Sequence, residues 1–142
     1  MRILPDLSIY ISVLSSEDKF HQATKAFLEH LKSPKNEFIV PTLVMLEVGN
    51  VIQKMKPKTG IEKLYSIFEN GIIVEIDETF TYKALPIFKN LNLKTSDAII
   101  ATVAKLWKAT LFSWDKKLLK ESTKIVPSFS PVTYKRHLES TV

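Results

Sequence analysis

The sequence predicts an α/β fold, a three-layer α/β/α sandwich whose central, mostly parallel sheet has about five strands. The main observation is that short, continuous apolar runs alternate with longer segments of helical periodicity. Because these runs do not alternate with polar residues, they are typical of strands buried on both faces, as in a parallel sheet covered by helices. A length of 142 residues with 45% hydrophobic residues indicates one domain with one core.

Five apolar runs are predicted to be strands, and they occupy residues 2–5, 37–40, 71–76, 110–113 and 124–126. Apolar residues spaced three and four positions apart predict helices at residues 7–14, 18–31, 42–55, 59–69, 78–90, 95–108 and 116–121. Residues 128–142 show neither pattern clearly. They are expected to form a partly ordered tail of a single domain that spans residues 1–142.

Residues with capping preferences lie where several of these helices are predicted to begin. Ser16 and Thr95 can cap the starts of two helices, and Pro41 lies where another begins. Pro86 is different because it falls inside a helical segment, where it removes an amide donor. We expect it to kink or divide that helix.

The chain lacks the residues that several catalytic classes require. It has no cysteine, which excludes disulfides, Cys-ligated metals and thiol catalysis and is compatible with a reducing compartment. Its three glycines lie far apart, so phosphate-cradling loops are absent, and its three histidines have no metal-ligand spacing. The N-terminus does not resemble a signal sequence and no apolar segment is long enough to span a bilayer, so the expected location is cytoplasmic with no membrane contact.

The net charge of +5 favours a polyanionic partner such as RNA, because lysines that face phosphates release condensed counterions. Arg2 and Arg136 are the only arginines, so contact with phosphates is expected rather than reading of base edges. A lysine-rich surface that serves only solubility explains the composition equally well.

Two acids interrupt the apolar faces of predicted helices. Glu47 shares its face with Val44 and Val51, and Asp97 shares its face with Ile100 and neighbouring alanines. An acid in the middle of a helix on an apolar face has no capping use and is costly to bury. Glu47 is therefore the acid that is hardest to explain structurally.

Two further acids, Asp6 and Asp115, follow predicted strands. Open α/β sheets bind ligands at the carboxyl ends of their strands, so all four acids are expected to converge there. Converging carboxylates repel one another unless a cation lies among them, and hard oxygen ligands suit Mg²⁺ or Mn²⁺. The predicted metal ligands are Asp6, Glu47, Asp97 and Asp115.

Three of these acids also have a structural interpretation, which the sequence leaves open. Asp6 and Asp115 could cap the helices that follow them. Asp97 could be a first-turn acid favoured by the helix dipole.

The order and spacing of these motifs resemble the PIN-domain family, including the VapC-like toxin ribonucleases of VapBC toxin–antitoxin pairs. The resemblance rests on Asp6-Leu7-Ser8, the helix with Glu47, Asp97-Ala98 before an alanine-containing apolar helix, and Ser113-Trp114-Asp115. Some members carry a further acid after the last motif, where this chain has Lys116 and Lys117.

The resemblance implies a PIN-like fold and a metal-dependent endoribonuclease that leaves 3′-hydroxyl and 5′-phosphate ends. By the same resemblance the four acids hold the metal, and Ser8 and Ser113 orient them through their hydroxyl groups. A VapB-like antitoxin protein and a homodimer are the implied protein partners.

Other side chains near the acids are candidates for contact with RNA. Lys54 lies on the Glu47 face, and three lysines follow Asp115, so the candidate phosphate contacts are Lys54, Lys116, Lys117 and Lys120. Trp114 either closes its strand as a buried side chain or stacks on an unpaired base.

The alternative function is a non-catalytic PIN-like module that binds RNA or a protein. Two other acidic α/β classes are excluded. A phosphoacceptor receiver domain requires paired acids after the first strand, and a haloacid-dehalogenase-type phosphatase requires an Asp-x-Asp motif, and the chain has neither.

Overall fold

The sheet is parallel throughout and has the strand order β3-β2-β1-β4-β5 in a computed structural model that describes residues 1–141. The strands are β1 (Arg2–Pro5), β2 (Glu37–Pro41), β3 (Ile72–Val74), β4 (Thr110–Phe112) and β5 (Ser128–Phe129). Their register places Pro5 beside Phe112, so β1 and β4 end at the same edge. The predicted α/β fold with a five-stranded parallel sheet is confirmed.

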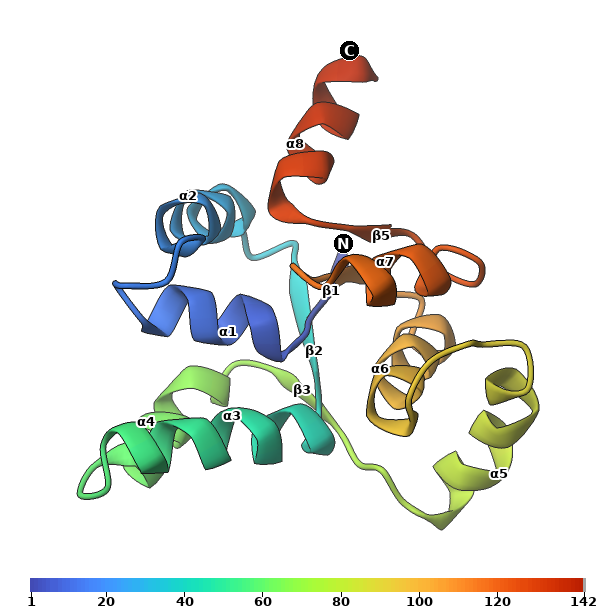
Figure 1. Ribbon diagram of the computed structural model, residues 1–142, viewed down its shortest axis with the longest axis horizontal. Coiled ribbons are helices and arrows are strands. Elements are labelled where there is room, and N and C mark those ends of the chain that lie inside the picture. The colour runs from blue at the N-terminus through green and yellow to red at the C-terminus, as the bar shows by residue number, and fades with distance from the viewer. Residues whose placement is uncertain (142) are drawn as a thin grey trace.

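Eight helices are formed by residues 1–141, and seven of them connect the strands. They are α1 (Leu7–Leu14), α2 (His21–Leu31), α3 (Thr42–Met55), α4 (Gly60–Phe68), α5 (Glu78–Phe88), α6 (Thr95–Leu106), α7 (Lys116–Ser122) and α8 (Pro131–Ser140). Figure 1 shows α1 to α4 on one side of the sheet and α5 to α7 on the other. This division follows from right-handed crossovers, because the chain moves outward from β1 to β3 and then back across to β4 and β5.

The hydrophobic core lies on both faces of the central strands. On β1, Ile3 packs in one group with Phe27 and Phe112, whereas Leu4 packs in a larger group with residues such as Val44 and Val103. These side chains are almost completely buried. The alternation along β1 is what a strand covered by helices on both faces requires.

The last strand lies later in the chain than the sequence predicts, so this prediction was wrong. Residues 124–126 were expected to form it, but the amides of Ile125 and Val126 both bond to the Ser122 carbonyl and close α7 instead. Val126 is buried, so its apolar character serves packing rather than strand pairing. The strand comes later, at Ser128–Phe129.

Residues 128–140, expected to belong to a partly ordered tail, form β5 and α8. Ser130 and Thr133 make a reciprocal capping box at the start of α8, and Pro131 occupies its first turn. Tyr134 packs edge-on against Phe112, which attaches α8 to the core. Residue 142 of the expected tail lies outside the described residues.

Pro86 does not divide its helix. Helix α5 continues through it and ends two residues later, at Phe88. The carbonyl that loses its amide partner belongs to Tyr82, whose side chain is 70% exposed, so water can reach this face of the helix. None of the helices in residues 1–141 has the length and apolar composition needed to cross a lipid bilayer.

Candidate metal centre

Asp6 lies where β1 gives way to α1, at the carboxyl edge of the sheet. Its amide donates to the Phe112 carbonyl at 3.0 Å, which continues the pairing of β1 with β4 beyond the last strand residue. Asp6 is only 5% exposed. The carboxylate is thus fixed between two central strands rather than on a mobile loop.

Both oxygens of the Asp6 carboxylate accept hydrogen bonds. Oδ1 accepts from the Ser8 hydroxyl at 2.5 Å, the Ser8 amide at 3.0 Å and the Ile9 amide at 3.4 Å, so Asp6 also caps α1. Oδ2 accepts from the Ser113 hydroxyl at 2.6 Å. Burial raises the pKa of Asp6 to about 6, although the bonds from Ser113 and Ser8 act in the opposite direction.

The two serines link the ends of β1 and β4. The Ser113 hydroxyl, which is fully buried, donates to Asp6 and accepts from the Asp115 amide at 2.9 Å. The Ser8 hydroxyl accepts from the Trp114 amide at 2.8 Å. These bonds fix the position of the Asp6 carboxylate relative to the backbone that precedes Asp115.

Glu47 lies in the second turn of α3, which starts directly after β2. The side chain is half-buried, and its Oε1 atom is buried with no hydrogen-bond partner among residues 1–141. Burial raises the pKa of Glu47, the charge of Asp97 raises it further, and Lys94 lowers it. A buried carboxylate oxygen without a hydrogen-bond partner destabilises the folded protein, unless a ligand from outside the chain binds it.

Asp97 lies in the first turn of α6 and faces the same region. Burial raises its pKa, and the nearby charge of Asp115 does so too, while Lys94 and Lys117 lower it. Its neighbour Ala98 is buried, so the helix start packs closely against the protein. Asp97 therefore occupies a first-turn position that the helix dipole favours, and it also lies close to another negative charge.

Asp115 caps α7 and is the most open of the four acids. Its Oδ1 accepts from the amides of Lys117 at 2.9 Å and Leu118 at 3.1 Å. Among residues 1–141 its other oxygen, Oδ2, accepts no hydrogen bond from a side chain or a backbone amide. The capping interpretation is correct for this residue, and it leaves one oxygen available for a ligand.

All four acids line one cavity of about 370 Å³ at the carboxyl edge of the sheet. A larger cavity of about 620 Å³ lies between α2 and α8, but alanines, aromatic residues and other largely apolar side chains line it, and it contains none of these acids. The acidic cavity is therefore the candidate functional site, since three of the acids that line it have raised pKa values.

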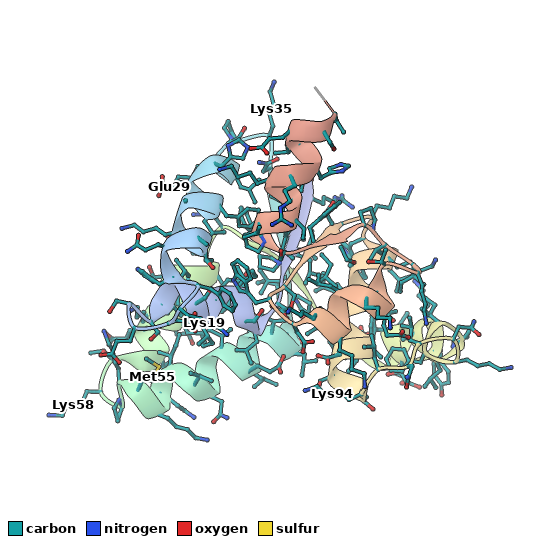
Figure 2. The ribbon with its side chains drawn as sticks, turned by 45° about the horizontal axis from the view of Figure 1, so that its top comes forward. Lys19, Glu29, Lys35, Met55, Lys58 and Lys94 are labelled. Atoms are coloured by element: carbon teal, nitrogen blue, oxygen red, sulfur yellow. The ribbon has the colours of Figure 1, made fainter. Side chains whose placement is uncertain are left out.

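Sequence reasoning missed three residues that line the acidic cavity, namely Asp18, Phe20 and Lys94. Lys94, labelled in Figure 2, immediately precedes α6 and influences both Glu47 and Asp97. Its position directly before the Asp97 helix was the available signal. Asp18 and Phe20 lie in the loop between α1 and α2. The sequence predicts them to be the start of a helix at residues 18–31, which gave no sign of a role in the cavity.

The four lysines proposed from the sequence are not equally close to this cavity. Lys117 lies near enough to lower the pKa of Asp97. Lys116 and Lys120 are exposed on α7, and Lys54 is exposed in the last turn of α3, about 10 Å along the helix axis from Glu47. Figure 2 shows other lysines, such as Lys35 and Lys58, extending from distant parts of the molecule.

The donor set fits a hard divalent cation. It consists of carboxylate oxygens without sulfur or imidazole, which suits Mg²⁺ or Mn²⁺. The unpaired Oε1 of Glu47 is an available ligand atom. Within the part of the chain that the structure describes, however, no three acidic or histidine side chains are grouped tightly enough to hold an ion as they stand. Binding would require some of these side chains to rotate toward one another.

The fold and the cavity define a class: an α/β protein with an acidic cavity at the carboxyl edge of a parallel sheet of order 3-2-1-4-5. The chain belongs to the PIN domain family, whose model matches residues 3–122. No curated protein matches the chain significantly.

Solved structures of VapC toxins and related toxin–antitoxin proteins share the fold. A chain of VapBC2 from Rickettsia felis, crystallised on a promoter DNA fragment, has a TM-score of 0.67 and 21% identity over 92% of this chain and 98% of that chain. FitAcB from Neisseria gonorrhoeae has a TM-score of 0.69 and 17% identity over 93% and 99%. VapC20 from Mycobacterium tuberculosis, a toxin that cleaves the sarcin–ricin loop, has a TM-score of 0.66 and 12% identity over 82% and 92%.

Proposed function

We propose that this protein is a metal-dependent endoribonuclease in which Asp6, Glu47, Asp97 and Asp115 bind Mg²⁺ or Mn²⁺. The observation that carries the proposal is that all four acids line one cavity at the carboxyl edge of the sheet. Membership of the PIN domain family supports it. The unpaired buried oxygen of Glu47 supports a ligand role over a structural one.

A bound divalent ion would supply a water of lowered pKa and neutralise charge on the scissile phosphodiester. The residues of the chain position the parts. Ser8 and Ser113 hold both oxygens of Asp6, so its orientation does not depend on the substrate. Glu47 and Asp97, whose pKa values are raised, are the candidates to accept a proton from the attacking water.

Lysines next to the acids are proposed to contact RNA phosphates. Lys94 is the best placed because it lines the cavity, and Lys117 lies near enough to lower the pKa of Asp97. Lys116 and Lys120 lie on α7 with Lys117. Lys54 would contact only a longer RNA that runs along α3.

The test is cleavage of structured RNA by wild type and by Asp97→Asn, with Mg²⁺, Mn²⁺ or EDTA. Asp77→Asn is the matched control, because Asp77 caps α5 outside the cavity and Asn caps nearly as well. Cleavage by wild type and control alone, abolished by EDTA, is expected. Equal cleavage by Asp97→Asn, or cleavage that survives EDTA, contradicts the proposal.

We further propose that the enzyme is the toxin of a toxin–antitoxin pair, with a VapB-like antitoxin and a homodimer as its assemblies. The support is likeness of fold to proteins crystallised as VapBC complexes. Growth arrest on expression, absent with Asp97→Asn and relieved by coexpression of a small protein encoded beside this one, is the expected result. Normal growth during expression of active enzyme contradicts the toxin role.

A further inference from the structure

A stacked aromatic pair stands at the rim of the acidic cavity. The rings of Phe20 and Trp114 lie parallel, with an interplanar angle of 4° and centroids 4.0 Å apart. Both residues line the cavity together with the proposed metal ligands, including Asp115. Two parallel, stacked rings beside a candidate active site form a platform on which a third flat group can stack.

Trp114 is the fixed member of the pair. Its indole N–H donates to the Thr24 hydroxyl at 2.9 Å, its backbone amide donates to Ser8, and its ring packs on the core group around Phe112. Thr24 is completely buried and is itself bonded to the Ser12 hydroxyl at 2.7 Å. The orientation of the indole ring is therefore set from inside the protein.

Phe20 has no such attachment for its ring. Its backbone amide donates to the Asp18 carboxylate at 2.8 Å, but its side chain belongs to none of the three core groups formed by residues 1–141. One ring face rests on Trp114, and the ammonium group of Lys19 lies over the ring at 4.9 Å from the centroid. Because Trp114 occupies the first face, Lys19 covers the second. This column of Lys19, Phe20 and Trp114 is called the aromatic rim below.

We propose that the aromatic rim is a base-binding site, in which an unpaired base of the RNA substrate stacks on the outer face of Phe20 in place of the Lys19 ammonium. Every base has a flat π face, so such a site binds unpaired nucleotides with little sequence preference. The displaced lysine, exposed and flexible, then contacts a neighbouring phosphate. This inference rests on the proposed ribonuclease function and specifies how its substrate is held.

Charge favours a base over a phosphate at this position. Asp18 lies in the same loop and lines the cavity with the four proposed ligands, so an anion beside Phe20 would face several carboxylates. An uncharged base avoids that repulsion. The cation that covers this ring face belongs to an exposed lysine side chain, so a polar partner rather than the apolar core lies against it.

The test measures binding of a fluorescein-labelled, unstructured octanucleotide RNA by anisotropy in Ca²⁺, with a gel to verify that the RNA stays intact. Each nucleotide is made abasic in turn, and wild type is compared with Phe20→Leu and Phe20→Tyr. Leu keeps apolar cover on Trp114 but offers no π face. The matched control is Tyr82→Leu, since Tyr82 is exposed on α5 and lies outside the acidic cavity.

Phe20→Leu is expected to bind about 5- to 150-fold more weakly than wild type, with Phe20→Tyr and Tyr82→Leu near wild type. One abasic position should weaken wild type by a similar factor and leave Phe20→Leu unchanged. Equal binding by Phe20→Leu, the same abasic profile in both proteins, or no binding by wild type overturns the base site. If binding behaves as expected but Mg²⁺ and Mn²⁺ produce no cleavage, the proposed function fails and the base site stands.

Discussion

In the metal-free protein, Asp6→Asn is expected to gain stability relative to wild type as the pH rises from about 4 to 7. Burial raises the pKa of Asp6 from 3.8 to about 6. Between these values the folded protein holds a proton that the unfolded chain has released, so stability falls as pH rises. The rise in pKa corresponds to a loss of about 3 kcal/mol by neutral pH. Asparagine does not ionise and avoids this loss.

The assay is urea unfolding in EDTA at several pH values from 4 to 7.5 for wild type, Asp6→Asn and the control Asp77→Asn. The bonds from Ser8 and Ser113 that asparagine satisfies differently add an offset that does not depend on pH. The informative quantity is therefore the change with pH in the difference between the two unfolding free energies. A difference that stays constant from pH 4 to 7.5 refutes the claim that burial of an ionised Asp6 destabilises the fold.

Two further variants test how neighbouring residues support the site. Ser113→Ala removes the hydroxyl that bonds both Asp6 and the Asp115 amide. We expect the free energy of unfolding in urea to fall by about 1–3 kcal/mol, and metal affinity measured by calorimetry to weaken about 10- to 100-fold. Unchanged metal affinity contradicts this. Lys94→Ala removes the charge that lowers the pKa values of two acids, so the acid limb of the pH–rate profile is expected to move to higher pH, whereas Lys58→Ala leaves it in place. A shift to lower pH, or no shift, argues against the role of Lys94.

The sheet and most helices were predictable because the apolar pattern records burial. Helices α1 and α3 begin and end where the periodicity predicts. Errors arose where two signals compete. Helix α2 starts at His21 rather than at residue 18, because the Asp18 carboxylate bonds the Phe20 amide in a turn before the helix. In the run at 124–126, Val126 is buried in the same core group as Leu118 of α7, and burial alone does not distinguish a buried turn from a strand.

The acids of the candidate site were predictable for a related reason. Glu47 and Asp97 break apolar helix faces, and Asp6 and Asp115 follow strands, so fold topology alone brings them to one edge. The sequence did not predict that Asp6 would be the most deeply buried of the four acids, because its burial depends on how the end of β1 pairs with β4. The Ser8 and Ser113 hydroxyls that bond its carboxylate come from two separate segments.

The sequence indicated only one aromatic residue of the aromatic rim, Trp114. Trp114 stands inside a motif, and both a buried role and a stacking role were open. The structure shows that its indole N–H bonds the buried Thr24 hydroxyl while one ring face meets Phe20. Phe20 is more than 90 residues away in the chain, at the start of a segment that the sequence predicts to be helical, so no local pattern links the two.

Titration calorimetry with Mn²⁺ tests the metal site most directly, because it does not require the RNA target to be known. Wild type and Asp77→Asn are expected to bind Mn²⁺ saturably and to release protons as the carboxyl groups with raised pKa values ionise. Asp97→Asn is expected to lose most of this binding. Binding of equal affinity in all three proteins, or no saturable binding by wild type, would contradict a metal centre formed by Asp6, Glu47, Asp97 and Asp115.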